Sequence, residues 1–66
     1  MLGANIKALR QSAGMTQAAL AELMGVSQQA VAFWEAEKSA PQAIDIPKLA
    51  AALKCSYDQL FEKEVG

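Results

Sequence analysis

The sequence has no histidine, a single cysteine and few aromatic residues. With Cys55 alone and no His, the chain can form neither an internal disulfide nor a Cys/His zinc site, and we expect Cys55 to be inert. Aromatic residues make up 6% of the chain although 53% is hydrophobic, and most of the rest is Ala and Leu, which favour helices. The 66 residues therefore predict one all-α domain, spanning residues 1–66, that is stabilised by packing.

The sequence also lacks the residues that several functional classes require. There is no long uncharged apolar run and no signal-like N-terminus, so we expect a cytoplasmic protein with no membrane segment. No Gly-rich phosphate loop is present, and no nucleophile has an adjacent base. We therefore expect a protein that is not an enzyme and that needs no cofactor, metal or small-molecule ligand.

Capping residues and glycines divide the chain into five predicted helices. The first is expected over residues 4–13, because apolar residues recur at helical spacing and Gly14 follows. Its buried face is expected to consist of Leu2, Ile6, Leu9 and Ala13.

The second and third predicted helices are separated by only three residues. Thr16 is expected to cap a helix over residues 17–24, which ends at Gly25, and Ser27 to cap a helix over residues 28–35. So short a connection with a small residue forces the two helices to meet at an angle, which predicts a helix-turn-helix over about residues 17–35. The third helix should turn Ala30, Val31 and Trp34 inward, and Gln28, Gln29, Ala32 and Phe33 outward.

The rest of the chain predicts two shorter helices. After a loop over residues 36–44, Asp45 is expected to cap a fourth helix that has Pro47 in its first turn. The spacing of Ser56 and Gln59 is that of a capping box, which predicts a fifth helix carrying Leu60 and Phe61. The tail over residues 62–66 is expected to fray.

Residues 16–35 resemble the helix-turn-helix of the lambdoid phage repressor and Cro family. The resemblance rests on the Thr16-Gln17 opening, Ala21, Gly25 and the Trp34-Glu35 pair at fixed offsets, and it continues through residues 6–10 and 57–61. It implies a compact five-helix bundle of the lambda repressor type that regulates transcription by reading operator DNA in the major groove.

The resemblance also implies roles for individual residues. Glutamine early in a helix docked in the major groove can pair with adenine, and free N–H groups at helix starts can hold phosphates. We expect base contacts from Gln28, Gln29, Ala32 and Phe33, and phosphate contacts from Thr16, Gln17, Ser27 and Lys38. In this family Gln17 can also brace Gln28, and Arg10 pairs with Glu35 to join the first and third helices.

Three features weigh against DNA binding. The net charge is −1, although residues 1–54 carry +1 and residues 55–66 carry −2, so the acidic excess lies at one end. The stretch 36–38 lacks the Asn-Gly that often follows Trp-Glu in the family, so the third helix can run on and Glu37 can repel a phosphate. Outward Leu23 and Phe33 suggest contact with a partner.

The resemblance further implies that the partner is double-stranded DNA, bound by a homodimer on a pseudo-palindromic site, with the fifth helix and the loop before the fourth near the dimer contact. The alternative is a protein-interaction module that uses the same fold without binding DNA. The acidic balance together with Leu23 and Phe33 would suit that alternative.

Overall fold

The computed structural model describes residues 2–62, and over these residues it contains helices and no strands. The predicted all-α five-helix fold is confirmed, with one additional 3-10 turn. In chain order the elements are α1 (Leu2–Ser12), α2 (Gln17–Met24), α3 (Gln28–Glu35), η1 (Ala43–Asp45), α4 (Ile46–Leu53) and α5 (Tyr57–Leu60). None of the helices described is long and apolar enough to span a membrane.

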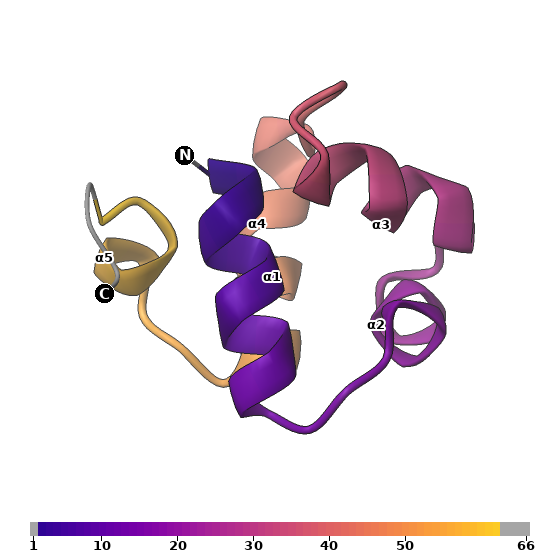
Figure 1. The fold of residues 1–66 in the computed structure, drawn as a ribbon. Helices are drawn as coiled ribbons and strands as arrows, with labels where there is room; N and C mark the ends of the chain where they lie inside the picture. Colours follow the sequence, from indigo (N-terminus) through magenta and orange to yellow (C-terminus); the bar gives the residue numbers. More distant parts are fainter. Residues whose placement is uncertain (1, 63–66) are drawn as a thin grey trace.

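Helix α1 lies in the middle of the bundle (Figure 1). The α2–α3 pair lies on one side of α1, α5 lies on the other, and α4 runs behind it (Figure 1). Every helix contributes to one apolar core, which contains Ile6, Leu20, Ala21, Met24, Val31, Trp34, Leu49, Ala50, Leu53 and Leu60. With a core this small, each of these side chains is a substantial part of the stability, since burying a Leu or Ile is worth about 1.5–3 kcal/mol.

The bounds of α2 and α3 are those that their capping residues predict. The Thr16 hydroxyl oxygen accepts from the Ala19 N–H at 3.0 Å, and the Ser27 hydroxyl oxygen accepts from the Ala30 N–H at 3.1 Å. Each bond satisfies one of the N–H groups left unpaired at a helix start, which is typically worth about 1 kcal/mol. Local sequence therefore fixes where both helices of the pair begin.

The first helix differs from its prediction at both ends. It begins at Leu2 instead of residue 4, and it ends at Ser12. Ala13, predicted to be buried, is exposed, because the chain has already left the helix by that point. Ile6 is fully buried and Leu9 is half-buried, as the apolar spacing predicts.

Asp45 occupies the N-cap position of α4 as predicted, but its side chain does not cap the helix. Asp45 has helical backbone angles and its side chain makes no cap bond to α4. Its carboxylate accepts instead from the Gln42 N–H at 3.2 Å, at the start of η1. The predicted loop 36–44 thus ends in a 3-10 turn that leads directly into α4, and Pro47 lies in the first turn of α4 as expected.

The capping box of α5 is confirmed. The Ser56 hydroxyl accepts from the Gln59 N–H at 3.1 Å, and the Gln59 side chain accepts from the Ser56 N–H at 2.9 Å. Leu60 is fully buried, whereas Phe61 is 56% exposed. Most of the tail expected to fray, residues 63–66, lies outside the described residues.

Buried Asn5 is a structural residue that the sequence analysis did not single out. Its side-chain amide donates to the carbonyl oxygens of Leu60 at 2.8 Å and Glu62 at 2.7 Å, which ties α1 to the end of α5. The signal was available, since Asn5 falls between Leu2 and Ile6 on the apolar stripe of the first helix. A polar side chain on a buried stripe requires hydrogen-bond partners.

Candidate nucleic-acid interface

The turn between α2 and α3 sets the angle of the helix pair. Gly25 adopts a left-handed conformation with φ of 72°, and its N–H donates to the last turn of α2. The Val26 N–H then donates to the Ala21 carbonyl at 3.0 Å, which closes the turn. Ala21 is 4% exposed, and its small side chain is part of the apolar core.

The inner face of α3 is anchored in the core, which leaves the opposite face to solvent. Val31 and Trp34 are buried, and Ala30 is half-buried. Of the predicted base-contact residues, Gln28 and Gln29 are exposed, Phe33 is 39% exposed and Ala32 is half-buried. All four lie on one face of α3, with both glutamines in its first turn.

Three of the residues expected to contact phosphate lie at helix ends: Thr16 precedes α2, Ser27 precedes α3 and Lys38 follows α3. Thr16 and Ser27 use their hydroxyl oxygens as acceptors for their own helices, which leaves each hydroxyl hydrogen free to be donated outward. Lys38 follows α3, and its ammonium group lies 5.7 Å from the centre of the Phe33 ring, within cation–π range.

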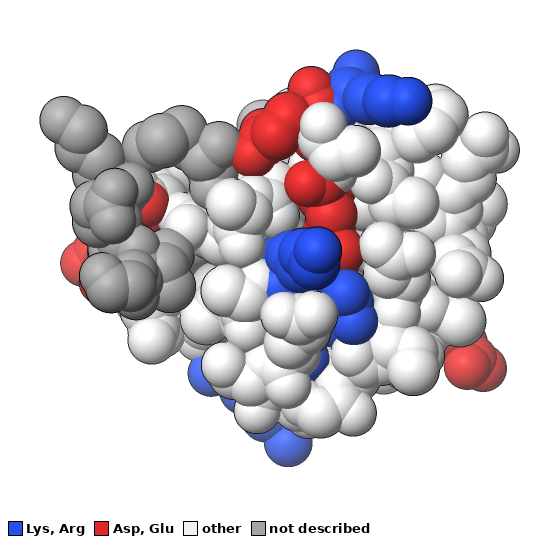
Figure 2. Space-filling view, in the orientation of Figure 1, with Lys and Arg blue, Asp and Glu red and all other residues white. Residues whose placement is uncertain are grey.

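Charge is not concentrated on α3. Figure 2 shows the acidic and basic side chains close together over α1 and the end of α3, while the surface over α3 itself is mainly uncharged. An anionic ligand on this face would therefore be held by helix starts, amides and hydroxyls more than by Lys or Arg.

A polar network joins α1 to α3. Arg10 Nε donates to Glu35 Oε2 at 2.6 Å, and a terminal guanidinium nitrogen donates to Glu35 Oε1 at 3.1 Å, in a two-point ion pair between α1 and α3. The side chains are only 10% and 4% exposed. Arg10 also donates to the Met15 carbonyl at 2.7 Å. The pair that the resemblance implied is thus present, and it also reaches the segment before α2.

Gln17 is linked to the same network. Its Nε2 donates to Glu35 Oε1 at 3.0 Å. Burial raises the pKa of Glu35, but the hydrogen bonds from Arg10 and Gln17, together with the positive charges of Arg10 and Lys7, outweigh burial and hold that pKa below its ordinary value. The bracing of Gln28 by Gln17 remains a prediction, whereas the link from Gln17 to Glu35 was not foreseen.

Helix α3 ends at Glu35 and does not run on. Glu37 has φ of 62°, and the Lys38 N–H donates back to the Phe33 carbonyl at 2.9 Å. The Glu37 carboxylate accepts from the Ala4 N–H at 3.2 Å, which places a negative charge at the N-terminal end of α1. Glu37 is therefore engaged with α1, a role that the sequence analysis missed.

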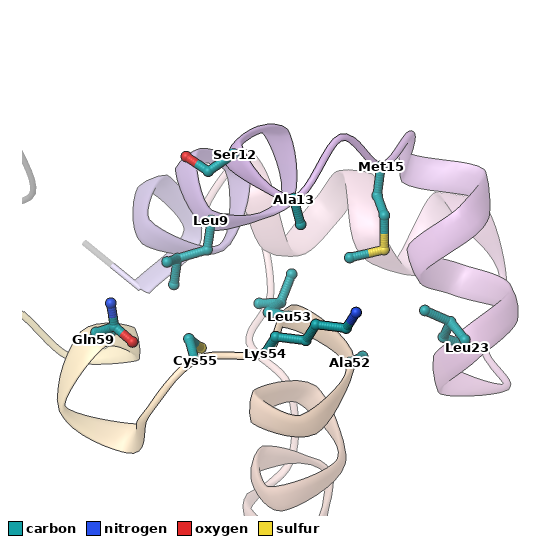
Figure 3. Close-up of a pocket in the computed structure, with 10 residues that line it drawn as sticks. All are labelled: Leu9, Ser12, Ala13, Met15, Leu23, Ala52, Leu53, Lys54, Cys55 and Gln59. Carbon is teal, nitrogen blue, oxygen red and sulfur yellow. The ribbon is translucent and has the colours of Figure 1, made fainter.

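A groove of about 640 Å³ opens between α1, α2, α4 and α5 (Figure 3). No residue of α3 lines it. Leu23, which is 57% exposed, lies on its α2 side. Cys55 also lines the groove, and burial raises the pKa of its thiol, which disfavours the reactive thiolate.

A family model described as "Helix-turn-helix" (HTH_3) matches residues 6–60, which is most of the sequence. The chain belongs to this family. This helix-turn-helix chain is 34% identical over its 66 residues to the repressor protein C2 of Salmonella phage P22. It spans about a third of the length of that curated relative, 31%.

Two solved structures resemble the helix-turn-helix chain closely. A crystal structure of the P22 c2 repressor in complex with synthetic operator 9T has a TM-score of 0.86 at 34% identity, and 97% of each chain is covered. The solution structure of the DNA-binding domain of the P22 C2 repressor has a TM-score of 0.90 at 33% identity, covering 100% of this chain and 87% of the other. The predicted lambda repressor type of fold is thereby confirmed.

Proposed function

We propose that this chain is the DNA-binding part of a transcriptional repressor that reads an operator sequence in the major groove, without catalysing a reaction. The observation that carries the proposal is the outward face of α3, where Gln28 and Gln29 are exposed in the first turn of a helix whose opposite face is buried. The similar P22 repressor, which was crystallised with an operator, supports DNA as the ligand.

The first turn of α3 contacts the bases and so recognises the DNA sequence. The amide of Gln28 offers a donor and an acceptor in one plane, which matches the N6 and N7 of adenine. Gln29 and Ala32 lie beside Gln28 on the same face, and Phe33 extends it by a further turn. The side chains closest to the helix start reach deepest into the groove in this docking geometry.

Phosphate binding falls to the groups around α3. Thr16, Gln17 and Ser27 supply donors at the starts of α2 and α3, where the free N–H groups and helix dipoles favour anions. Lys38 is the charged contact on the other side of the face. This division explains how a chain with net charge −1 can bind DNA.

The bound form is a homodimer on a pseudo-palindromic site. The two segments expected near the dimer contact expose large apolar side chains, Ile44 in η1 at 80%, Tyr57 in α5 at 53% and Phe61 beside it at 56%. Exposed apolar side chains of this size favour an association surface.

Selection of bound sequences from a random duplex pool tests the proposal. Wild type should enrich one site, and Gln28→Ala should bind it about 1–3 kcal/mol more weakly and relax the preference at one position of each half-site. Gln11→Ala, an exposed glutamine of α1, serves as the control that leaves selection unchanged. Equal losses of Gln28→Ala on the selected site and on random DNA would refute base reading by Gln28.

The second candidate function is protein binding without DNA. It is favoured by Leu23, which is 57% exposed and lines the groove in Figure 3, to which α3 contributes no residue. Titration of a duplex at two salt concentrations separates the two candidates. Binding that weakens steeply with salt supports the repressor, and no binding at low salt supports the interaction module.

A further inference from the structure

We infer that Glu35 is a positioning residue for DNA binding, because it turns the amide of Gln17 so that a nitrogen-bound hydrogen faces the backbone phosphate. The inference rests on the proposed function and adds to it a residue that itself touches no DNA. It connects the ion pair behind the helix pair to the phosphate contact at the start of α2.

The Glu35 carboxylate is held rigidly. Two nitrogens of Arg10 donate to its two oxygens, at 2.6 and 3.1 Å, and its side chain is only 4% exposed. Arg10 is fixed in turn by its bond to the Met15 carbonyl at 2.7 Å, directly before the cap of α2. The carboxylate is therefore a fixed acceptor, and Gln17 bonds to it at 3.0 Å from the first position of α2.

A fixed carboxylate favours one of the two orientations of a neighbouring amide. The oxygen and the NH2 group of glutamine have nearly the same size, so packing alone does not distinguish them. A carboxylate can only accept hydrogen bonds, so it attracts the NH2 end of Gln17 and repels the oxygen end. Glu35 thereby disfavours the flipped amide of Gln17, in which the oxygen would face the carboxylate in place of Nε2.

The disfavoured orientation matters because a phosphate is also an acceptor. Nε2 carries two hydrogens, and the bond to Glu35 uses one of them. Among the described residues the second hydrogen has no acceptor, and Gln17 is only half-buried, so we assign this hydrogen to a phosphate oxygen of bound DNA. Glu35 also fixes the rotamer, which removes part of the entropy that Gln17 would lose on binding DNA.

A double-mutant cycle on DNA affinity tests the inference. The background is Arg10→Met with Glu35→Leu, which replaces the ion pair by apolar groups and leaves no unpaired buried charge. In wild type, Gln17→Ala should weaken binding to the selected duplex about 10-fold, as expected for a hydrogen bond to a charged group. In the background lacking Glu35, the same change should weaken binding less than about 2-fold, because the amide is no longer oriented.

The possible outcomes separate the two proposals. If Gln17→Ala costs the same in both backgrounds, Glu35 only joins α1 to α3 and the inference is overturned, while repressor function stands. No effect of Gln17→Ala in wild type overturns the inference in the same way. Failure of wild type to bind any duplex at low salt overturns the proposed function itself. Gln11→Ala is the matched control and should be silent in both backgrounds.

A measurement on the wild-type protein covers the case in which the double variant does not fold. One of the two side-chain Nε2 hydrogens of Gln17 should give a proton resonance shifted downfield by the carboxylate, and this shift should persist when the selected duplex is added. The second hydrogen should shift only on binding. Loss of the first shift in the complex would show that Gln17 leaves Glu35 to reach DNA, which contradicts the inference.

Discussion

Phe33 is one of the large apolar side chains that the protein leaves exposed. Its ring is 39% exposed on the outward face of α3, with the Lys38 ammonium 5.7 Å from its centre. An apolar ring can neither donate nor accept a hydrogen bond with a base edge. The base feature left for it in the major groove is the C5-methyl group of thymine.

We therefore predict that Phe33 reads one thymine in each half-site. Burying the ring against the methyl group should contribute on the order of 1 kcal/mol, at about 25 cal/mol per Å² of apolar surface. Uracil in place of that thymine should weaken wild type and leave Phe33→Ala nearly unaffected, as measured by affinity at each thymine of the selected site. If both proteins respond alike at every position, Phe33 does not contact a thymine methyl.

Gly3 is a second residue whose role is set by its surroundings. A Cβ atom at Gly3 would clash with the Trp34 carbonyl oxygen, a backbone atom that can move only together with α3. Gly3→Ala should therefore push α1 away from α3 and lower the free energy of unfolding by about 1–3 kcal/mol, measured by urea denaturation.

Gly25 provides the contrasting control for Gly3. It has φ of 72° but nothing within 4 Å of an added Cβ, so its constraint is conformational. Asn tolerates the left-handed region better than Ala, so Gly25→Asn should be milder than Gly25→Ala. At Gly3 the order should reverse, because Asn is larger. The same order at both positions would contradict the steric explanation for Gly3.

Between elements, the strongest polar connection is the pair that joins α1 to α3. Arg10→Met alone leaves the Glu35 carboxylate buried without its partner, which should cost about 3 kcal/mol of stability. Adding Glu35→Leu should restore most of this loss, because no charge then remains uncompensated. Thermal or urea unfolding of the two single variants and the double variant measures the coupling, and simple additivity would refute it.

The pair also predicts how stability depends on pH. The folded-state pKa of Glu35 lies below its ordinary value of 4.5, so its contribution is fully present above about pH 4.5 and is lost as the pH falls through the folded pKa. Between pH 7 and pH 3, wild type should therefore lose more free energy of unfolding than Arg10→Met with Glu35→Leu. Equal losses would mean that other carboxylates account for the whole effect.

The elements also show what local sequence can predict. Thr16, Ser27 and Gly25 act within their own turns, so the bounds of α2 and α3 follow from the sequence. The start of α1 does not, because the partner of its Ala4 N–H is Glu37, 33 residues away. The role of Asp45 was not predictable for a related reason. Its carboxylate accepts from the Gln42 N–H at the start of η1, a turn that no sequence pattern indicates.

In the candidate site, too, local features could be predicted and contacts between helices could not. The exposed face of α3 could be predicted, because helical spacing places Gln28 and Gln29 opposite Val31 and Trp34. The Arg10–Glu35 pair came from the family resemblance and not from spacing. The bond from Gln17 to Glu35 depends on how α2 and α3 pack, so it required three-dimensional coordinates. Contacts between helices are the part that a single sequence leaves open.

At the scale of the whole molecule, the bundle places α3 and α5 on different sides of α1. Helix α5 lies on the side of α1 away from the α2–α3 pair, so the exposed face of α3 and the apolar side chains of α5 belong to different parts of the surface (Figure 1). In the proposed complex, the exposed face of α3 contacts DNA while the surface of α5 contacts a second copy. Two copies related by a two-fold axis would present two α3 helices to successive major grooves on one side of the duplex.

This arrangement predicts a strict dependence on half-site spacing. Two half-sites should bind best about 10–10.5 base pairs apart, one helical turn, and inserting about 5 base pairs should remove the gain by turning one half-site to the opposite side of the duplex. Phe61→Ser, which changes an exposed side chain beside α5, should reduce the gain from the second half-site and leave affinity for a single half-site unchanged. Gel-shift titrations of one-site, two-site and spaced duplexes measure these quantities, with Gln11→Ala as a surface control. If wild type binds the two-site duplex no more tightly than two independent single sites, at every spacing, the chain binds DNA as a monomer.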